Sequence, residues 1–117
     1  MENFGSYDEI AERLAEKEGV MTVRIGSLRD VHGAGRLGIH VRTNISKELA
    51  MRGIGHLPPE LPDSQEELVR LYKKGSPAGE LIEAVLVPST GKDKVIRDTV
   101  QADAQETLEK IRELVEI

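Results

Sequence analysis

The sequence contains no cysteine and only three aromatic residues, Phe4, Tyr7 and Tyr72. A chain without cysteine forms neither disulfide bonds nor thiolate metal sites, which fits the reducing cytoplasm. Proteins that bind single-stranded nucleic acid usually stack its bases on aromatic side chains, so the scarcity of aromatics argues against that class. The core is therefore expected to consist of Leu, Ile, Val and Ala side chains.

Long apolar segments are also missing. No apolar run approaches the roughly 20 residues that a transmembrane helix requires, and the acidic N-terminus lacks the apolar segment of a secretory signal. These features predict a soluble, cytoplasmic protein without a membrane partner. A chain of 117 residues can bury roughly two thirds of its unfolded surface. We expect a globular domain over residues 1–98 and a C-terminal helix over residues 99–117, which packs on the domain or on a second subunit.

Charge is distributed unevenly along the chain. Residues 1–19 and 57–117 are net acidic, whereas residues 20–56 carry six basic groups against Asp30 and Glu48. Such a segment either presents an anion-binding surface or pairs with the acidic segments on both sides of it. The six basic residues are Arg24, Arg29, Arg36, Arg42, Lys47 and Arg52.

The first elements are marked by capping signals. Ser6 and Glu9 form a capping box before apolar residues at helical spacing, which predicts a helix over residues 7–18. The segment VMTVRI that follows is either a strand or the start of a short helix. In the second interpretation Ser27 caps the N-terminus of that helix and Gly33 ends it.

Residues 37–52 fit two patterns. Apolar residues recur at every fourth position, as on one face of a helix, whereas residues 37–43 also alternate as in a strand. We favour one helix over residues 38–52, with its apolar face toward the core. That face consists of Leu37, Val41, Ile45 and Leu49.

A proline-rich loop separates this segment from the remaining elements. A second capping box at Ser64 and Glu67 favours a helix that ends before Gly75, although LVRLY could also be a strand. Ser-Pro at residues 76–77 begins another helix, which ends at Pro88. The turn PSTGKDK is then expected to form the tip of a hairpin. The chain ends in an amphipathic helix with apolar residues Val100, Ala104, Leu108, Ile111 and Val115.

The stretch HGAGRLG has the Gly-x-Gly-x-x-Gly spacing of a dinucleotide-binding fingerprint. That fingerprint requires an apolar strand before the first glycine and repeated β-α units, whereas LRDV precedes Gly33 here. We therefore expect the glycines to serve a turn between two helices. Gly33 would end the first helix, Gly35 would allow a sharp turn, and Gly38 would let the next helix approach closely.

Residues with catalytic or metal-binding chemistry form no recognisable pattern. His32, His40 and His56 lack the spacing of metal ligands, and neither a GxSxG motif nor a P-loop is present. No nucleophile lies beside a base in the sequence. We therefore predict a non-enzymatic protein without a metal or other cofactor.

The stretch LRDVHGAGRLGIHVRTNISKELAMRGIGHLP, within residues 27–58, resembles small winged helix-turn-helix modules of prokaryotic regulatory and defence proteins. The similarity lies in a short helix, a Gly-Arg-x-Gly turn, apolar residues at every fourth position and a glycine before a proline-rich loop. It implies an α+β, mostly helical, winged-helix-like domain. Such modules often bind double-stranded DNA, and some bind only proteins.

The basic segment and this resemblance together predict a DNA-associated regulatory or accessory protein. Its basic face would contact phosphates, and the later hairpin would act as a wing. The alternative is a protein-interaction module, such as a subunit, adaptor or antitoxin-like partner, that uses the C-terminal helix; that helix would also suit a homodimer. The expected DNA-contacting residues are Arg36, His40, Arg42, Thr43, Lys47, Lys92 and Lys94.

Overall fold

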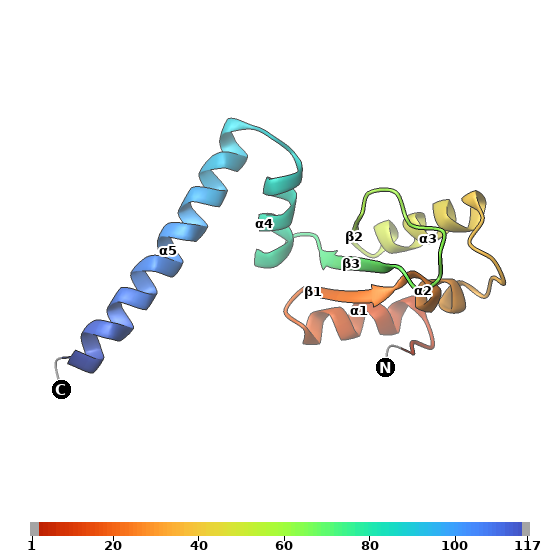
Figure 1. The fold of residues 1–117 in the computed structure, drawn as a ribbon, viewed down its shortest axis with the longest axis horizontal. Coiled ribbons are helices and arrows are strands. Elements are labelled where there is room, and N and C mark those ends of the chain that lie inside the picture. The colour runs from red at the N-terminus through yellow and green to blue at the C-terminus, as the bar shows by residue number, and fades with distance from the viewer. Residues whose placement is uncertain (1–2, 116–117) are drawn as a thin grey trace. The chain divides into compact units, whose positions relative to one another are not determined.

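The protein has an α+β fold, mostly helical, with a three-stranded antiparallel sheet (Figure 1). The computed structural model describes the backbone of residues 3–115 and the side chains in that range except those of residues 103, 104, 107, 110, 114 and 115. The chain forms two compact units, Met1–Gly79 and Glu80–Ile117. The division expected between residues 98 and 99 falls within a helix. No described helix is both long and apolar enough to cross a membrane.

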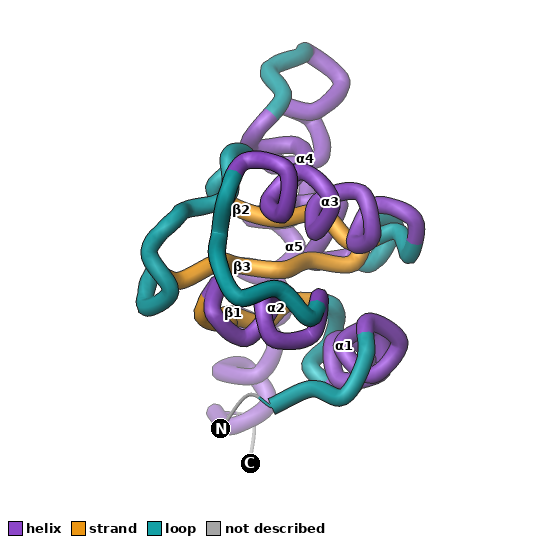
Figure 2. The backbone as a smooth tube through the Cα atoms, turned by 90° about the vertical axis from the view of Figure 1, so that its right-hand side faces the viewer, coloured by secondary structure: helices purple, strands orange, loops and turns teal. Residues whose placement is uncertain are grey.

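The first unit alternates helices and strands. The strand order in its sheet is β1-β3-β2, and β3 pairs with both neighbours in antiparallel register. Figure 2 shows α1 on the β1 side of this sheet and α3 beside β2. The elements are α1 (Tyr7–Glu16), β1 (Val20–Arg24), α2 (Ile25–His32), α3 (Ile39–Met51), β2 (Ile54–Leu57) and β3 (Leu68–Lys73).

Helix α1 begins as the capping box predicts. The Glu9 backbone N–H donates to the Ser6 hydroxyl at 3.1 Å, and the Gly5 N–H donates to the Glu9 carboxylate at 2.6 Å. These bonds satisfy amide groups that a helix start otherwise leaves unpaired. The helix ends at Glu16, and Gly19 in a left-handed conformation (φ 89°) turns the chain into β1.

The segment VMTVRI was expected to be either a strand or the start of a short helix, and it is both in succession. Strand β1 ends at Arg24, and α2 starts at Ile25 without a side-chain cap. The prediction that Ser27 caps α2 is therefore wrong, because Ser27 lies buried inside the helix. Gly33 ends α2 with a left-handed φ of 78°, as predicted.

Residues 68–73 form a strand where the capping box favoured a helix. Ser64 and Glu67 do interact, but the Glu67 N–H donates to the Ser64 carbonyl at 2.8 Å and closes a turn. Strand β3 follows because Val69 and Leu71 alternate with exposed Leu68 and Arg70, so one face of the sheet is buried.

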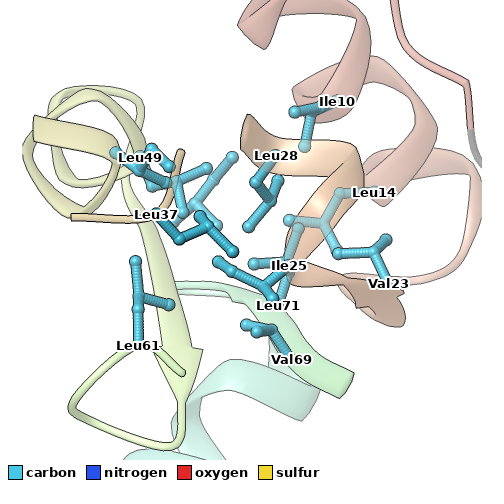
Figure 3. Close-up of a cluster of buried hydrophobic side chains, with 12 residues drawn as sticks. Ile10, Leu14, Val23, Ile25, Leu28, Leu37, Leu49, Leu61, Val69 and Leu71 are labelled. Atoms are coloured by element: carbon cyan, nitrogen blue, oxygen red, sulfur yellow. The ribbon is translucent and has the colours of Figure 1, made fainter. Parts of the chain in front are cut away.

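The core of the first unit is made of aliphatic side chains from every one of its elements (Figure 3). The apolar face of α3 contributes Ile45 and Leu49, and Leu37 joins the core from the preceding turn. The helix predicted over residues 38–52 is therefore confirmed, and residues 37–43 are not a strand. The other buried members are Ile10, Leu14, Val23, Ile25, Leu28, Ile54, Leu61, Val69 and Leu71.

The second unit contains most of α4 (Pro77–Leu86) and all of α5 (Thr90–Val115). The hairpin expected around PSTGKDK does not form. Ser89 instead starts α5, because its hydroxyl accepts the Lys92 N–H at 3.0 Å and its carbonyl accepts the Asp93 N–H at 2.9 Å. Ser89 thus has the capping role that serine often has at a helix start.

Candidate nucleic-acid interface

Four of the six basic residues in the central segment are held by contacts within the first unit. Arg24 pairs with Glu66 at 3.3 Å, and Arg29 donates to Gln65 at 2.7 Å and to Asp30 at 3.1 Å. The loop between β2 and β3 is thereby fastened to β1 and α2. The alternative expectation, that these arginines pair with the acidic segments on both sides, is confirmed for Arg24, whereas Arg29 pairs with Asp30 inside the central segment.

Arg42 connects the start of α3 to neighbouring backbone through two hydrogen bonds. Its Nε donates to the Leu37 carbonyl at 3.1 Å and its Nη1 donates to the Leu61 carbonyl at 3.0 Å. The planar guanidinium thus joins the turn before α3 to the β2–β3 loop. The structure gives Arg42 this internal role, whereas the sequence had suggested a phosphate contact.

Arg52 closes the other end of α3. It pairs with Asp8 at 3.0 Å and with Glu48 at 2.9 Å, and its guanidinium lies 5.1 Å from the centre of the Tyr7 ring. The hydrogen bonds to Asp8 and to Glu48 raise the pKa of Arg52 above its ordinary value. Tyr7 in turn bonds His32 at 2.8 Å, so the group links α1, α2 and α3.

The outward side of α3 remains exposed to solvent. His40, Thr43, Asn44 and Lys47 lie within about 100° of one another around this helix, opposite Ile45 and Leu49 in the core. Arg36 is exposed in the turn before α3. Arg36 and Lys47 form no ion pair with any residue that the structure describes. We call Arg36, His40, Thr43, Asn44 and Lys47 the α3 face.

The N-terminus of α3 adds backbone donors beside this face. Gly38 occupies the cap position, no side chain bonds the amides of the first turn, and that turn contains no acidic residue. Unpaired amides at a helix start favour a negatively charged group. The close approach expected at Gly38 is wrong, because no atom lies within 4 Å of where its Cβ would be.

A groove of about 300 Å³ runs between α3 and the β2–β3 loop. The loop that forms its other wall carries four acidic residues and no basic one: Glu60, Asp63, Glu66 and Glu67. Glu60 lines the groove and opposes phosphate on that side. The remaining lining residues are Ile39, Arg42, Thr43, Ser46, Lys47, Ala50, His56, Pro59 and Leu61.

Ser46 and His56 meet in this groove, a pair that sequence spacing did not reveal. His56 Nδ1 lies 2.9 Å from the Pro58 carbonyl, so it donates there, and Nε2 accepts the Ser46 hydroxyl at 2.8 Å. The Ser46 hydroxyl lies in the middle of α3, where the backbone amides are already bonded within the helix. The Ser46–His56 hydrogen bond connects α3 to β2.

Lys92 and Lys94 belong to the second unit. Both lie in the first turns of α5, where Lys94 pairs with Asp98 at 2.7 Å and this bond raises the pKa of Lys94. They therefore do not form the tip of a wing. No cluster of three or more potential metal ligands occurs among the described residues.

The chain matches no protein-family model, no curated protein and no solved structure.

Proposed function

We propose that residues 1–79 form a winged-helix module that contacts double-stranded DNA through the α3 face. Their elements run α1-β1-α2-α3-β2-β3 and the sheet order is β1-β3-β2, which is the arrangement expected of a winged helix. In this assignment α3 is the helix that enters the major groove. The β2–β3 loop takes the place of the wing, where the sequence had suggested residues around Lys92.

The observation that carries the proposal is the separation of side chains around α3. Apolar residues fill the core side, whereas the α3 face presents to solvent three polar groups and two cations that have no ion pair among the described residues. Lys and Arg contribute phosphate contacts, and Asn, His and Thr can hydrogen-bond base edges. The amides at the start of α3 provide a further phosphate contact beside Arg36.

The charge around the α3 face sets the strength of this contact. Arg42 and Arg52 are engaged inside the fold, and the acidic β2–β3 loop repels phosphate. On the α3 face itself, Arg36 and Lys47 carry the positive charges that can neutralise phosphates. Binding by one copy should therefore be weak and should depend only modestly on salt.

Anisotropy of a labelled duplex at low salt tests the proposal. Arg36→Ala and Lys47→Ala should each weaken binding of unrelated duplexes to a similar degree, because phosphate contacts carry no sequence information. Lys17→Ala is the matched control, since it removes an exposed positive charge just after α1. Equal loss in all three variants would mean that net charge, and not the α3 face, determines binding.

A further inference from the structure

Exposed apolar side chains are concentrated in the second unit. Of the ten large apolar residues that are exposed among the described residues, seven lie in residues 80–117, which form the smaller unit. Isolated exposed apolar residues are normal on a soluble protein, whereas a gathering of them marks an interaction surface. The seven are Val85, Leu86, Val87, Val95, Val100, Leu108 and Ile111.

Three of these residues form a stripe along α5. Val100, Leu108 and Ile111 fall within about 80° of one another around the helix, and they are 63%, 58% and 51% exposed. Ala104 and Val115, whose side chains are not described, continue the same spacing in the sequence. Val95 lies at least about 140° from each of the three and is therefore on the opposite side of α5.

Covering this stripe would stabilise α5 appreciably. Full burial of a Val, Leu or Ile side chain contributes roughly 1.5–3 kcal/mol relative to exposure. Helices in proteins gain most of their stability from the packing of an apolar face and not from the propensity of their residues. A helix of 26 residues with such a stripe therefore requires an apolar surface to pack against.

The first unit offers no such surface among its described residues. Its large exposed apolar residues are Ile39 and Met51, at opposite ends of α3, and Leu68 at the start of β3. They do not form a continuous stripe. A second copy of α5 does present one, and a two-fold pair of identical surfaces is self-complementary.

Charge along α5 favours one orientation of such a pair. With Val100 of one helix level with Ile111 of the other, an antiparallel pair brings Asp98 of each helix within one residue of the level of Arg112 of the other, and these two oppositely charged residues lie about 40° apart around the helix. A parallel pair in register instead places identical charges side by side. An antiparallel pair also opposes the two helix dipoles, whereas a parallel pair aligns them.

We propose that α5 pairs with α5 of a second copy of this chain in antiparallel orientation. Val100, Leu108 and Ile111 form the buried seam of this pair. The pairing is independent of the proposed DNA contact, because the seam lies in a different unit from the α3 face. Each experiment below is carried out on the full chain without DNA.

The first test is the mass of the protein in solution by light scattering across a range of concentrations. The unaltered chain and Val95→Glu should both have the mass of two copies. Leu108→Glu should have the mass of one copy at the same concentrations, because it places a charge in the seam. A mass of one copy for the unaltered chain at every concentration would overturn the pairing.

The absence of cysteine makes orientation testable by disulfide formation between introduced cysteines. Val100 and Ile111 lie about 17 Å apart along one α5 helix. In an antiparallel pair that buries the seam, Val100→Cys should not bridge to itself but should bridge to Ile111→Cys when the two proteins are mixed. Bridging of Val100→Cys to itself, without the mixed product, would overturn the antiparallel arrangement. This test does not depend on whether Leu108→Glu folds.

Discussion

At the scale of single residues, arginines with the same charge have different roles in this protein. Arg42 and Arg52 each hold one end of α3 in place through hydrogen bonds, whereas Arg36 is exposed and has no ion pair among the described residues. Sequence shows the positive charge at each position but not its partners. Replacing Arg42 should therefore lower stability, whereas replacing Arg36 should weaken DNA binding.

Replacement of Arg42 should destabilise the fold. Arg42→Ala removes two hydrogen bonds from a charged donor to the Leu37 and Leu61 carbonyls, and we expect a loss of about 2 kcal/mol in the free energy of unfolding. Arg42→Lys should recover only part of it, because an ammonium group cannot bridge both carbonyls as a planar fork does. Urea denaturation gives these values. Arg36→Ala is the control and should change stability by no more than about 0.5 kcal/mol; a loss for Arg36→Ala as large as that for Arg42→Ala would contradict this assignment.

Tyr7 should make stability depend on pH in the alkaline range. Burial, followed by the negative charge of Glu48, raises the pKa of Tyr7 from 10.0 to about 12, and Arg52 opposes this shift. The unfolded chain loses the Tyr7 proton near pH 10 while the folded chain keeps it, so the contribution is complete below pH 10 and disappears as the pH rises to about 12. Tyr7→Phe should show a shallower fall in stability over this interval. Identical pH profiles for the two proteins would contradict the raised pKa.

At the scale of elements, local signals predicted the helix starts near Ser6 and Gly38 correctly, failed at Ser27 and Ser64, and identified strands poorly. The capping box at Ser6 and the repeat of apolar residues in α3 predicted those helices because their partners lie within a few positions in the sequence. The signal at Ser64 looked the same but produced a turn, because the pairing of β3 with β1 and β2 is a long-range interaction that local spacing does not encode. The Ser46–His56 pair was missed for the same reason.

The packing of β2 on β3 should depend on the absence of a side chain at Gly55. Gly55 lies opposite Tyr72 in the register, and a Cβ at Gly55 would overlap the Tyr72 ring. Gly55→Ala should therefore destabilise the fold by about 2 kcal/mol, as overpacking does. Gly35→Ala, where no atom lies within 4 Å of the added Cβ, should change stability little.

A double-mutant cycle identifies the cause of that loss. Tyr72→Leu removes the ring that the new Cβ meets, so Gly55→Ala should cost less in the Tyr72→Leu background than alone. Thermal unfolding of the four proteins gives the interaction energy. Strictly additive effects would show that the ring of Tyr72 is not what excludes a side chain at Gly55.

At the scale of the whole molecule, the two units carry different surfaces. Residues 1–79 present the α3 face, and residues 80–117 present the apolar stripe of α5. The basic central segment was visible in the sequence. Which of its cations lack an ion pair depends on tertiary contacts between distant segments, such as Arg52 with Asp8 and Arg24 with Glu66. The wing was expected at Lys92 because local spacing did not reveal that the hairpin is formed by β2 and β3.

The most direct measurement of the central claim is the salt dependence of duplex binding by the full chain. Each neutralised phosphate contributes about −0.9 to the slope of log affinity against log salt concentration, so Arg36 and Lys47 predict a slope of about −2 per bound copy. Arg36→Ala should reduce that slope by about 1. No binding at low salt, or a slope that Arg36→Ala and Lys47→Ala leave unchanged, would contradict a DNA contact through the α3 face.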